Sequence, residues 1–215
     1  MFGTYPKIKN LYKRDTTTGR VLIGEFSDPI FEYLQNNLWY IYEKIDGMNV
    51  RVIWDPATQT IAFRGKTDAA QMPAQLLENL AKRFTLEKMA DVFPNTAVCL
   101  YGEGYGPKIQ GGSYYRDDQD FILFDIRFPN SWALREVVTQ LAEILDTPCV
   151  PLVGIGPLTS FPLRFRELST FPSPCTGQPY KYEGFIARPN VPIFDQSGFP
   201  ITVKIKQRDF PSLAA

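Results

Sequence analysis

The sequence predicts an α+β fold in which a largely antiparallel β-sheet core is flanked by helices. Segments dense in β-branched and aromatic residues, which are typical of strands, follow one another across short polar turns. The two long segments with apolar residues at helical spacing stand between groups of strands, without the regular strand–helix alternation that builds a parallel sheet. Because we find no internal repeat and no linker, we expect one domain over residues 1–215.

The first predicted elements are a short helix and three strands. Asp28 followed by Pro29 is typical of a helix N-cap and its first turn. Strands are predicted over residues 38–45, 49–55 and 60–66, because these segments are rich in aromatic and β-branched residues. Turn dipeptides, Asp-Gly and Asp-Pro, separate them.

The middle and the end of the chain alternate between helices and strands less regularly. Apolar residues at helical spacing over residues 73–93 predict an amphipathic helix with a break near Thr85. Strands are predicted over residues 96–103 and 120–128. A helix capped by Ser131 is predicted over residues 132–145. A proline-rich segment over 148–179 follows and contains one short helix over 163–168. Two strands, over 182–188 and 201–206, close the chain.

The composition excludes several classes of protein. The chain has 23 basic and 23 acidic residues and no histidine. A polybasic coat, the serine–histidine and cysteine–histidine hydrolases, and histidine-ligated zinc enzymes are therefore excluded. Cys99, Cys149 and Cys175 form no C-x-x-C pair, which favours buried thiols in a reducing compartment over a zinc site or a disulfide framework. With no signal peptide and no long apolar run, we expect a cytoplasmic protein that contacts no membrane.

Basic residues gather near the N-terminus, where Asp15 is their one acidic neighbour. Two interpretations of this basic strip stay open at the level of sequence. It is either a solvated arm or a surface that contacts nucleic-acid phosphates. The strip consists of Lys7, Lys9, Lys13, Arg14 and Arg20.

Two glycine motifs do not indicate a known nucleotide-binding loop. The segment Gly65-Lys66-Thr67 resembles the end of a P-loop, but Thr60 stands where the motif requires glycine. The loop that begins at Gly102 carries Pro107 where a dinucleotide fingerprint needs its third glycine. A protein kinase is also disfavoured, because its H-R-D loop needs a histidine.

A series of short charged motifs remains, each on or beside a predicted strand. The first is Glu43-Lys44-Ile45-Asp46-Gly47, in which strand alternation places Lys44 and Asp46 on one face while Ile45 points inward. Alone, this K-x-D-G pattern is weak evidence, because hairpin turns supply many. The series continues in chain order with Arg64, Glu103, Phe124, Glu183, and Lys204 with Lys206.

This ordered series resembles the motifs of the covalent nucleotidyltransferases, which include ATP-dependent ligases and messenger-RNA capping enzymes. A finer match is to nick-sealing RNA ligases of the RNA ligase 2 type, through Asn49 after the lysine motif, Tyr101-Gly102-Glu103 followed by Gly106-Pro107, and the last strand. The resemblance covers about residues 5–210 and implies an adenylation domain with an antiparallel core. Only residues 207–215 follow the last motif, so we expect no C-terminal OB domain.

The resemblance implies an ATP-dependent ligase that joins a 5′-phosphate to a 3′-hydroxyl in three steps. Lys44 would attack the α-phosphorus of ATP to form lysyl-AMP, AMP would pass to the 5′-phosphate, and the 3′-hydroxyl would then displace AMP. A lysine with the usual pKa of about 10.4 is almost wholly protonated near neutral pH. Lys204, Lys206 and Mg²⁺ are expected to lower the pKa of Lys44, with Asp46 engaged by another group.

The same resemblance implies the cofactor contacts. Glu103 and Glu183 would hold Mg²⁺, with Mn²⁺ as its substitute, through the hydration shell, and Phe124 would stack on adenine. Plainer interpretations compete: a core phenylalanine, solvated strand-end carboxylates, and a lysine pair on an exposed sheet edge. The implied cofactor-binding residues are Glu43, Asp46, Asn49, Arg64, Glu103, Phe124 and Glu183.

The expected partners are ATP and RNA ends held in a nick or a duplex, with RNA/DNA hybrids as a variant substrate, and the expected state is a monomer. Two alternatives stay open. One is a minimal ATP-dependent DNA ligase, because the sugar of the substrate strand is not encoded in these motifs. The other is a nucleotide- or RNA-binding module without turnover. The resemblance suggests a phage-like or bacterial role in RNA repair.

Overall fold

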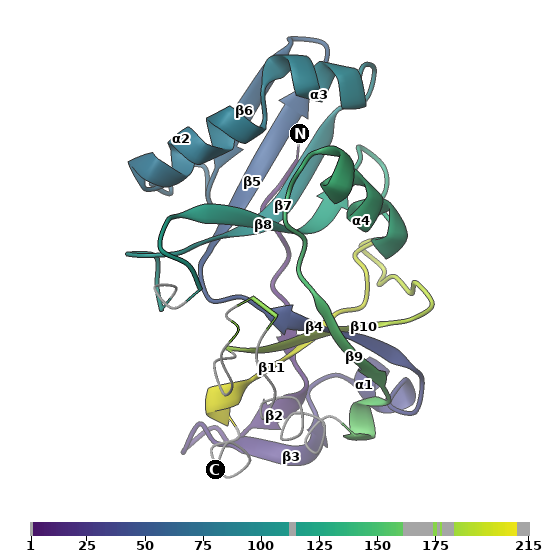
Figure 1. Cartoon of the computed structure of the whole chain (residues 1–215). Helices are drawn as coiled ribbons and strands as arrows, with labels where there is room; N and C mark the ends of the chain where they lie inside the picture. Colours follow the sequence, from purple (N-terminus) through teal and green to yellow (C-terminus); the bar gives the residue numbers. More distant parts are fainter. Residues whose placement is uncertain (1, 112–114, 161–173, 176, 178–182, 210–215) are drawn as a thin grey trace. The chain divides into compact units, whose positions relative to one another are not determined.

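The computed structural model describes residues 2–111, 115–160, 174–175, 177 and 183–209 (Figure 1). The chain divides into two compact units, which we call unit 1 (Met1–Pro6 and Asp46–Val150) and unit 2 (Lys7–Ile45 and Pro151–Ala215). Each unit contains its own mainly antiparallel sheet and its own hydrophobic core, with helices beside the sheet. The predicted α+β class with mainly antiparallel pairing is confirmed.

Unit 1 is built on a four-stranded sheet in the order β6-β5-β7-β8. Its strands are β5 (Met48–Asp55), β6 (Thr60–Arg64), β7 (Val98–Tyr105) and β8 (Asp120–Arg127), and every pairing among them is antiparallel. Strands β7 and β8 are buried along most of their length. Such continuous burial fits a sheet that is covered on both faces.

Two helices beside this sheet replace the single long helix of the sequence prediction. They are α2 (Ala74–Arg83) and α3 (Leu86–Val92). The predicted break is confirmed at Thr85, whose side chain caps α3 by accepting a hydrogen bond from the N–H of Lys88 at 3.2 Å. A polar side chain that satisfies a free backbone N–H ends one helix and starts the next.

The third helix of unit 1, α4 (Arg135–Ile144), corrects the sequence prediction at its start. We expected Ser131 to cap a helix over 132–145, but the N-cap is Leu134 and no side chain caps it. The Ser131 carbonyl instead accepts the N–H of Phe128, and Trp132 forms a bridge with Arg127. Because these residues first pair with the end of β8, the helix begins later.

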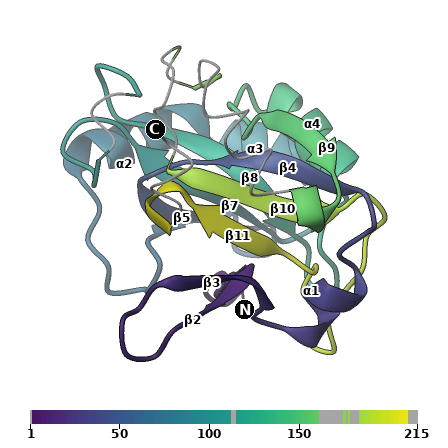
Figure 2. The ribbon, with the colours of Figure 1, turned by 90° about the horizontal axis from the view of Figure 1, so that it is seen from below.

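Unit 2 contains a five-stranded sheet in the order β1-β11-β10-β4-β9. Figure 2 shows β11, β10, β4 and β9 in this order. Only β1 pairs in parallel, with β11, and the other neighbours are antiparallel. The strands of this sheet are β1 (Lys9–Asn10), β4 (Trp39–Lys44), β9 (Leu152–Gly156), β10 (Gly184–Pro189) and β11 (Val203–Lys206). The central position of β10 decides how the charged residues described below meet.

Smaller elements complete unit 2. Helix α1 (Pro29–Tyr33) starts as predicted, with the Asp28 side chain accepting the N–H of Ile30. A hairpin of β2 (Tyr12–Arg14) and β3 (Val21–Phe26) pairs antiparallel. Two short 3₁₀ turns, η2 and η3, cover Leu158–Ser160 and Gln207–Asp209.

Four strands were missed or displaced in the sequence prediction. Strands β1 and β2 lie within the basic strip, and β3 lies in residues 21–26, where the sequence predicted no element. Strand β9 lies in the proline-rich segment. The predicted short helix over 163–168 and the first residue of the strand predicted from Tyr182 lie outside the described residues. In the part of the chain that the structure describes, no helix has the length and apolar character needed to cross a membrane.

Candidate active site

Lys44, the proposed nucleophile, lies in direct contact with Glu183. The Nζ of Lys44 lies 2.5 Å from Oε2 of Glu183, and the Nζ of Lys206 lies 2.7 Å from Oε1 of the same carboxylate. One glutamate therefore bridges two lysines. The three side chains are between 17% and 22% exposed, so the group is shielded but remains open to a ligand from solvent.

The strand register of unit 2 explains why these residues meet. Gly184 of β10 pairs with Lys44 of β4 on one side and with Lys206 of β11 on the other. Glu183 directly precedes Gly184, and its carbonyl accepts the N–H of Gln207 at 2.8 Å. A Cβ on Gly184 would meet the carbonyl oxygen of Ile205. The Glu-Gly pair thus brings a carboxylate close to β11 where another residue would not fit.

Lys204 adds a further positive charge to this group. Burial, followed by the charges of Lys206 and Lys44, lowers the pKa of Lys204 from its usual range. The charged form of such a lysine is disfavoured in the free protein, and an anion that binds beside it stabilises this charged form. The plainer interpretation, a lysine pair on an exposed sheet edge, is wrong because β11 lies between β1 and β10.

Glu43 lies on β4 next to Lys44 but points to the other face of the strand, since neighbouring side chains alternate. Its side chain is almost fully buried. The Cys175 thiol lies close by, and burial together with the Glu43 charge raises the pKa of that thiol. The N–H of Glu43 donates to the carbonyl of Pro151 at 3.2 Å.

Asp46 is held within unit 1. Its carboxylate Oδ2 accepts the N–H of Gly111 at 3.1 Å, and its own N–H donates to the hydroxyl of Tyr115 at 3.0 Å. The expectation that another group engages Asp46 is confirmed. Strand alternation does not fix the direction of this side chain, however, because β4 ends at Lys44. The expected inward packing of Ile45 is confirmed by its burial.

Asn49 and Glu103 lie opposite each other on β5 and β7 of unit 1. The Oδ1 atom of Asn49 is buried and has no hydrogen-bond partner in the described structure. A buried acceptor left without a donor is costly, which makes it a suitable place for a hydroxyl of a bound ligand. The close approach of this corner requires Gly47, because a Cβ there would meet the Gly104 carbonyl.

Phe124 of β8 is half-buried and lies outside the hydrophobic core of unit 1. Its ring contacts Tyr5 edge to face, with 4.9 Å between the ring centroids. The Tyr5 hydroxyl in turn donates to the buried carboxylate of Asp125 at 2.8 Å. The competing interpretation of Phe124 as a core residue is therefore disfavoured. Nothing in the sequence pattern singled out Tyr5.

Arg64 stands at the end of the edge strand β6 of unit 1, and its side chain is exposed. Its guanidinium donates to the carbonyl of the neighbouring Phe63 at 3.0 Å. An exposed guanidinium with free donor directions suits a forked contact with a phosphate. The described structure gives Arg64 no closer link to the other predicted residues.

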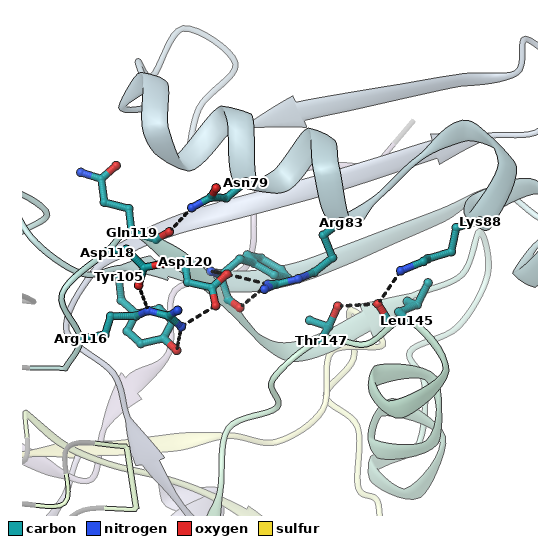
Figure 3. Close-up of polar contacts among 11 residues, drawn as sticks. Asn79, Arg83, Lys88, Tyr105, Arg116, Asp118, Gln119, Asp120, Leu145 and Thr147 are labelled. Carbon is teal, nitrogen blue, oxygen red and sulfur yellow. Dashed lines mark hydrogen bonds and ion pairs between the residues drawn. The ribbon is translucent and has the colours of Figure 1, made fainter.

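A hollow of about 270 Å³ in unit 1 contains none of the predicted site residues. Three cations and three carboxylates line it, together with an asparagine, so it has no net charge that would attract a triphosphate. Figure 3 shows five of these residues, Asn79, Arg83, Arg116, Asp118 and Asp120. Its lining residues are Asn79, Lys82, Arg83, Arg116, Asp118, Asp120 and Asp146. The group around Lys44 is the better candidate for phosphate binding.

The two sheets, which are antiparallel apart from β1, and the order of the charged motifs along the chain agree with the nucleotidyltransferase fold that the sequence resembles. Residues 37–206 match the family model described as RNA ligase. The chain belongs to the RNA ligase family.

Solved RNA ligases of Naegleria gruberi share this fold. A variant without ligand has a TM-score of 0.66 and 19% identity, and covers 98% of this chain and 58% of its own. A lysine-to-alanine variant solved with ATP and Mn has a TM-score of 0.66 and 18% identity, over 98% and 59%. A complex with PPi has a TM-score of 0.64 and 19% identity, and the match covers 97% of this chain and 63% of that ligase. The chain thus spans about three fifths of these ligases, and a search of curated proteins finds no match.

Proposed function

We propose that this chain is an ATP-dependent RNA ligase, or its adenylating part, in which residues 1–215 act as one nucleotidyltransferase module. The observation that carries the proposal is the contact of Lys44 with Glu183, beside Lys206 and Lys204. A primary amine stands there among cations that attract a polyphosphate. These are the two requirements for an amine to attack the α-phosphorus of ATP.

In the first step, the Lys44 amine gives up a proton and forms a P–N bond with the α-phosphorus, while the bond to the β-phosphate oxygen breaks and pyrophosphate leaves. Lys204 and Lys206 stabilise the negative charge of the phosphates. AMP then passes from Lys44 to a 5′-phosphate. In the last step, a 3′-hydroxyl attacks that phosphate, forms the phosphodiester bond and releases AMP.

A divalent cation fits the residues of this site. Glu183 of unit 2 offers a partly exposed carboxylate beside the lysines, and this is the ligand that the described geometry supports. Glu103, on β7 of unit 1, was the other carboxylate expected from the resemblance. Mg²⁺ binds through one or two carboxylates and keeps several waters, and Mn²⁺ takes similar ligands. When bound, the cation neutralises phosphate charge during transfer. The Naegleria structures with ATP and Mn support this assignment.

The remaining predicted residues receive roles in nucleotide binding. Asn49, with its orphaned buried oxygen, accepts a ribose hydroxyl, and Phe124 stacks on the adenine. Arg64 contacts a phosphate, of AMP or of the nucleic acid. Glu43 contributes through its backbone, and Asp46 is a fixed neighbour of the nucleophile.

The experiment that tests the proposal is adenylation with [α-³²P]ATP and Mg²⁺ followed by denaturing electrophoresis. We expect a labelled protein that is lost in Lys44→Ala. Lys82→Ala is the matched control, because Lys82 lies exposed on α2, where it pairs with the neighbouring Glu78. ATP binding without a covalent label would instead indicate a binding module without turnover.

The substrate is proposed to be an RNA 3′-hydroxyl end in a nick or a duplex, with RNA/DNA hybrids as a variant. Sealing assays on matched RNA, DNA and mixed nicks test this preference. We expect the strand with an RNA 3′ end to be sealed fastest, whereas equal sealing of all-DNA nicks would indicate a DNA ligase. A monomeric state and a cytoplasmic location stay predictions.

A further inference from the structure

The backbone N–H and the carboxylate of Asp46 are each bound by a residue that follows β7 in the chain. The N–H of Asp46 donates to the Tyr115 hydroxyl at 3.0 Å, and the Asp46 carboxylate accepts the N–H of Gly111 at 3.1 Å. The Asp46 N–H belongs to the peptide bond after Ile45, where the chain passes from unit 2 to unit 1. It lies two residues after Lys44. The Tyr115 hydroxyl therefore anchors the backbone two residues after the proposed nucleophile.

Tyr115 is itself held firmly. It is only 7% exposed, and its ring contacts Tyr105 edge to face, with 5.7 Å between centroids. The next residue, Arg116, places its guanidinium 5.6 Å from the centre of the Tyr105 ring. Arg116 also lies 2.5 Å from the carboxylates of both Asp118 and Asp120 (Figure 3). Charge-assisted contacts of this kind are stronger than ordinary hydrogen bonds.

The ionic network continues into helix α2. The largely buried carboxylate of Asp120 also pairs with Arg83 at 2.7 Å (Figure 3). Asp120 thereby links Arg83 of α2, the start of β8 and Arg116. The residue after Tyr115 is thus tied through Asp120 to the start of β8 and to α2, all within unit 1. Ion pairs at exposed positions contribute little, but a partly buried network fixes geometry.

We propose that Tyr115 is a positioning residue for the adenylation of Lys44, and that Arg116 holds Tyr115 in place. The inference rests on the proposed function. Attack by an amine on phosphorus depends on the direction of approach, and a displacement of about 1 Å can cost about 100-fold in rate. The Tyr115 hydroxyl limits the position of the Ile45–Asp46 peptide, which limits where the backbone of Lys44 ends.

The variant that tests the inference is Tyr115→Phe, which keeps the ring against Tyr105 and removes the acceptor for the Asp46 N–H. Single-turnover adenylation is measured over a range of ATP concentrations. We expect the rate constant at saturating ATP to fall by about 10- to 100-fold. The ATP concentration at half-maximal rate should change little, because the substitution leaves the lysines of the proposed phosphate group unchanged.

Two controls separate positioning from stability. Val138→Ala removes a fully buried side chain from the core of unit 1 without touching the segment after β7. This control should lower the thermal midpoint and the labelled fraction but leave the rate constant unchanged. Tyr33→Phe removes a hydroxyl from an 83% exposed tyrosine on α1 and should change neither quantity.

A double-mutant cycle tests the role of Arg116. Arg116→Met removes the ionic contacts while Asp120 keeps its partner Arg83. If Arg116 acts through Tyr115, the double variant Tyr115→Phe/Arg116→Met should be about as slow as the slower single variant. Multiplicative effects of the two substitutions would mean that Arg116 acts independently, and would overturn that part of the inference.

The outcomes also separate this inference from the proposed function. If the wild-type chain forms no Lys44-dependent adduct, the proposed function is wrong and the inference is wrong with it. If the wild type forms the adduct and Tyr115→Phe forms it at the wild-type rate, only the inference is wrong. A slower rate constant with an unchanged labelled fraction supports it.

Discussion

Lys204 shows at the scale of one residue how a ligand site costs stability in the free protein. Burial and the charges of Lys206 and Lys44 lower its pKa. A lowered pKa means that the folded chain binds the proton of Lys204 less tightly than the unfolded chain does. Below the lowered pKa, the charged lysine therefore destabilises the fold, and this cost disappears as the pH rises toward the usual value of 10.5.

Substitution Lys204→Met should consequently stabilise the ligand-free protein at pH 7 while it abolishes adenylation. The side chain is about half-buried, so solvent screening limits the gain to less than about 1 kcal/mol. For a chain of this length, that corresponds to a rise of about 2 °C in the thermal midpoint. Thermal unfolding at pH 7 and near pH 10 measures the effect, and the advantage of the variant should shrink at the higher pH. A lower midpoint at pH 7 would contradict the reasoning.

At the scale of an element, strand β10 organises the proposed active site. Its position between β4 and β11 brings the carboxylate of Glu183 to lysines from two different strands. The sequence placed these strands and these charged residues correctly. It could not give the strand order, because pairing between strands 139 residues apart, as for Lys44 and Glu183, leaves no local pattern.

The close contact of β10 with β11 yields a prediction for Gly184→Ala. An added Cβ would meet the carbonyl of Ile205, so the strands must separate and Glu183 must move away from Lys206. Overpacking of this kind costs about 1–3 kcal/mol of unfolding free energy. We expect a lower thermal midpoint and loss of labelling with [α-³²P]ATP. Gly3→Ala is the control, because a Cβ at Gly3 would meet open space; full labelling of Gly184→Ala would contradict this role.

Elements that the sequence misplaced share one physical cause. The start of α4 shifted because residues near Ser131 pair with β8 before the helix begins, and β9 was missed because glycines and prolines mask its pairing with β4. In both cases a tertiary contact overrides the local preference of the residues. Tyr115 was missed for a similar reason, since its contact with Asp46 spans 69 residues.

At the scale of the whole molecule, the division into units cuts through the motif that carries the chemistry. Lys44 belongs to unit 2, whereas Asp46 and Gly47 belong to unit 1. The motif from Glu43 to Gly47 did not indicate this boundary. Its Asp-Gly pair is equally typical of a hairpin turn and of a connection between two units. That the units act as one nucleotidyltransferase domain stays a prediction.

The charge of the whole chain governs how it should bind nucleic acid. With 23 basic and 23 acidic residues, the chain has no net positive charge that would attract RNA over a long distance. Part of the basic strip is already occupied, because Lys9 pairs with Asp28, and Arg14 lies 2.6 Å from Asp209. Of the two interpretations of this strip, a solvated arm or a phosphate-contacting surface, the structure leaves room for few phosphate contacts. We therefore expect no continuous binding surface for nucleic acid along it.

Few phosphate contacts imply a shallow salt dependence of binding. With about three contacts, raising the salt from about 50 to 200 mM should weaken the affinity for an RNA nick by about 40-fold, whereas proteins with 6–10 contacts lose about 1,000-fold or more. The proposed adenylation of Lys44 involves no nucleic acid, so its rate should change far less over the same range. Fluorescence anisotropy with a labelled nicked duplex, run beside the ATP-labelling assay, measures both responses. A 1,000-fold loss would show that the chain grips RNA through a much larger basic surface than its paired cations allow.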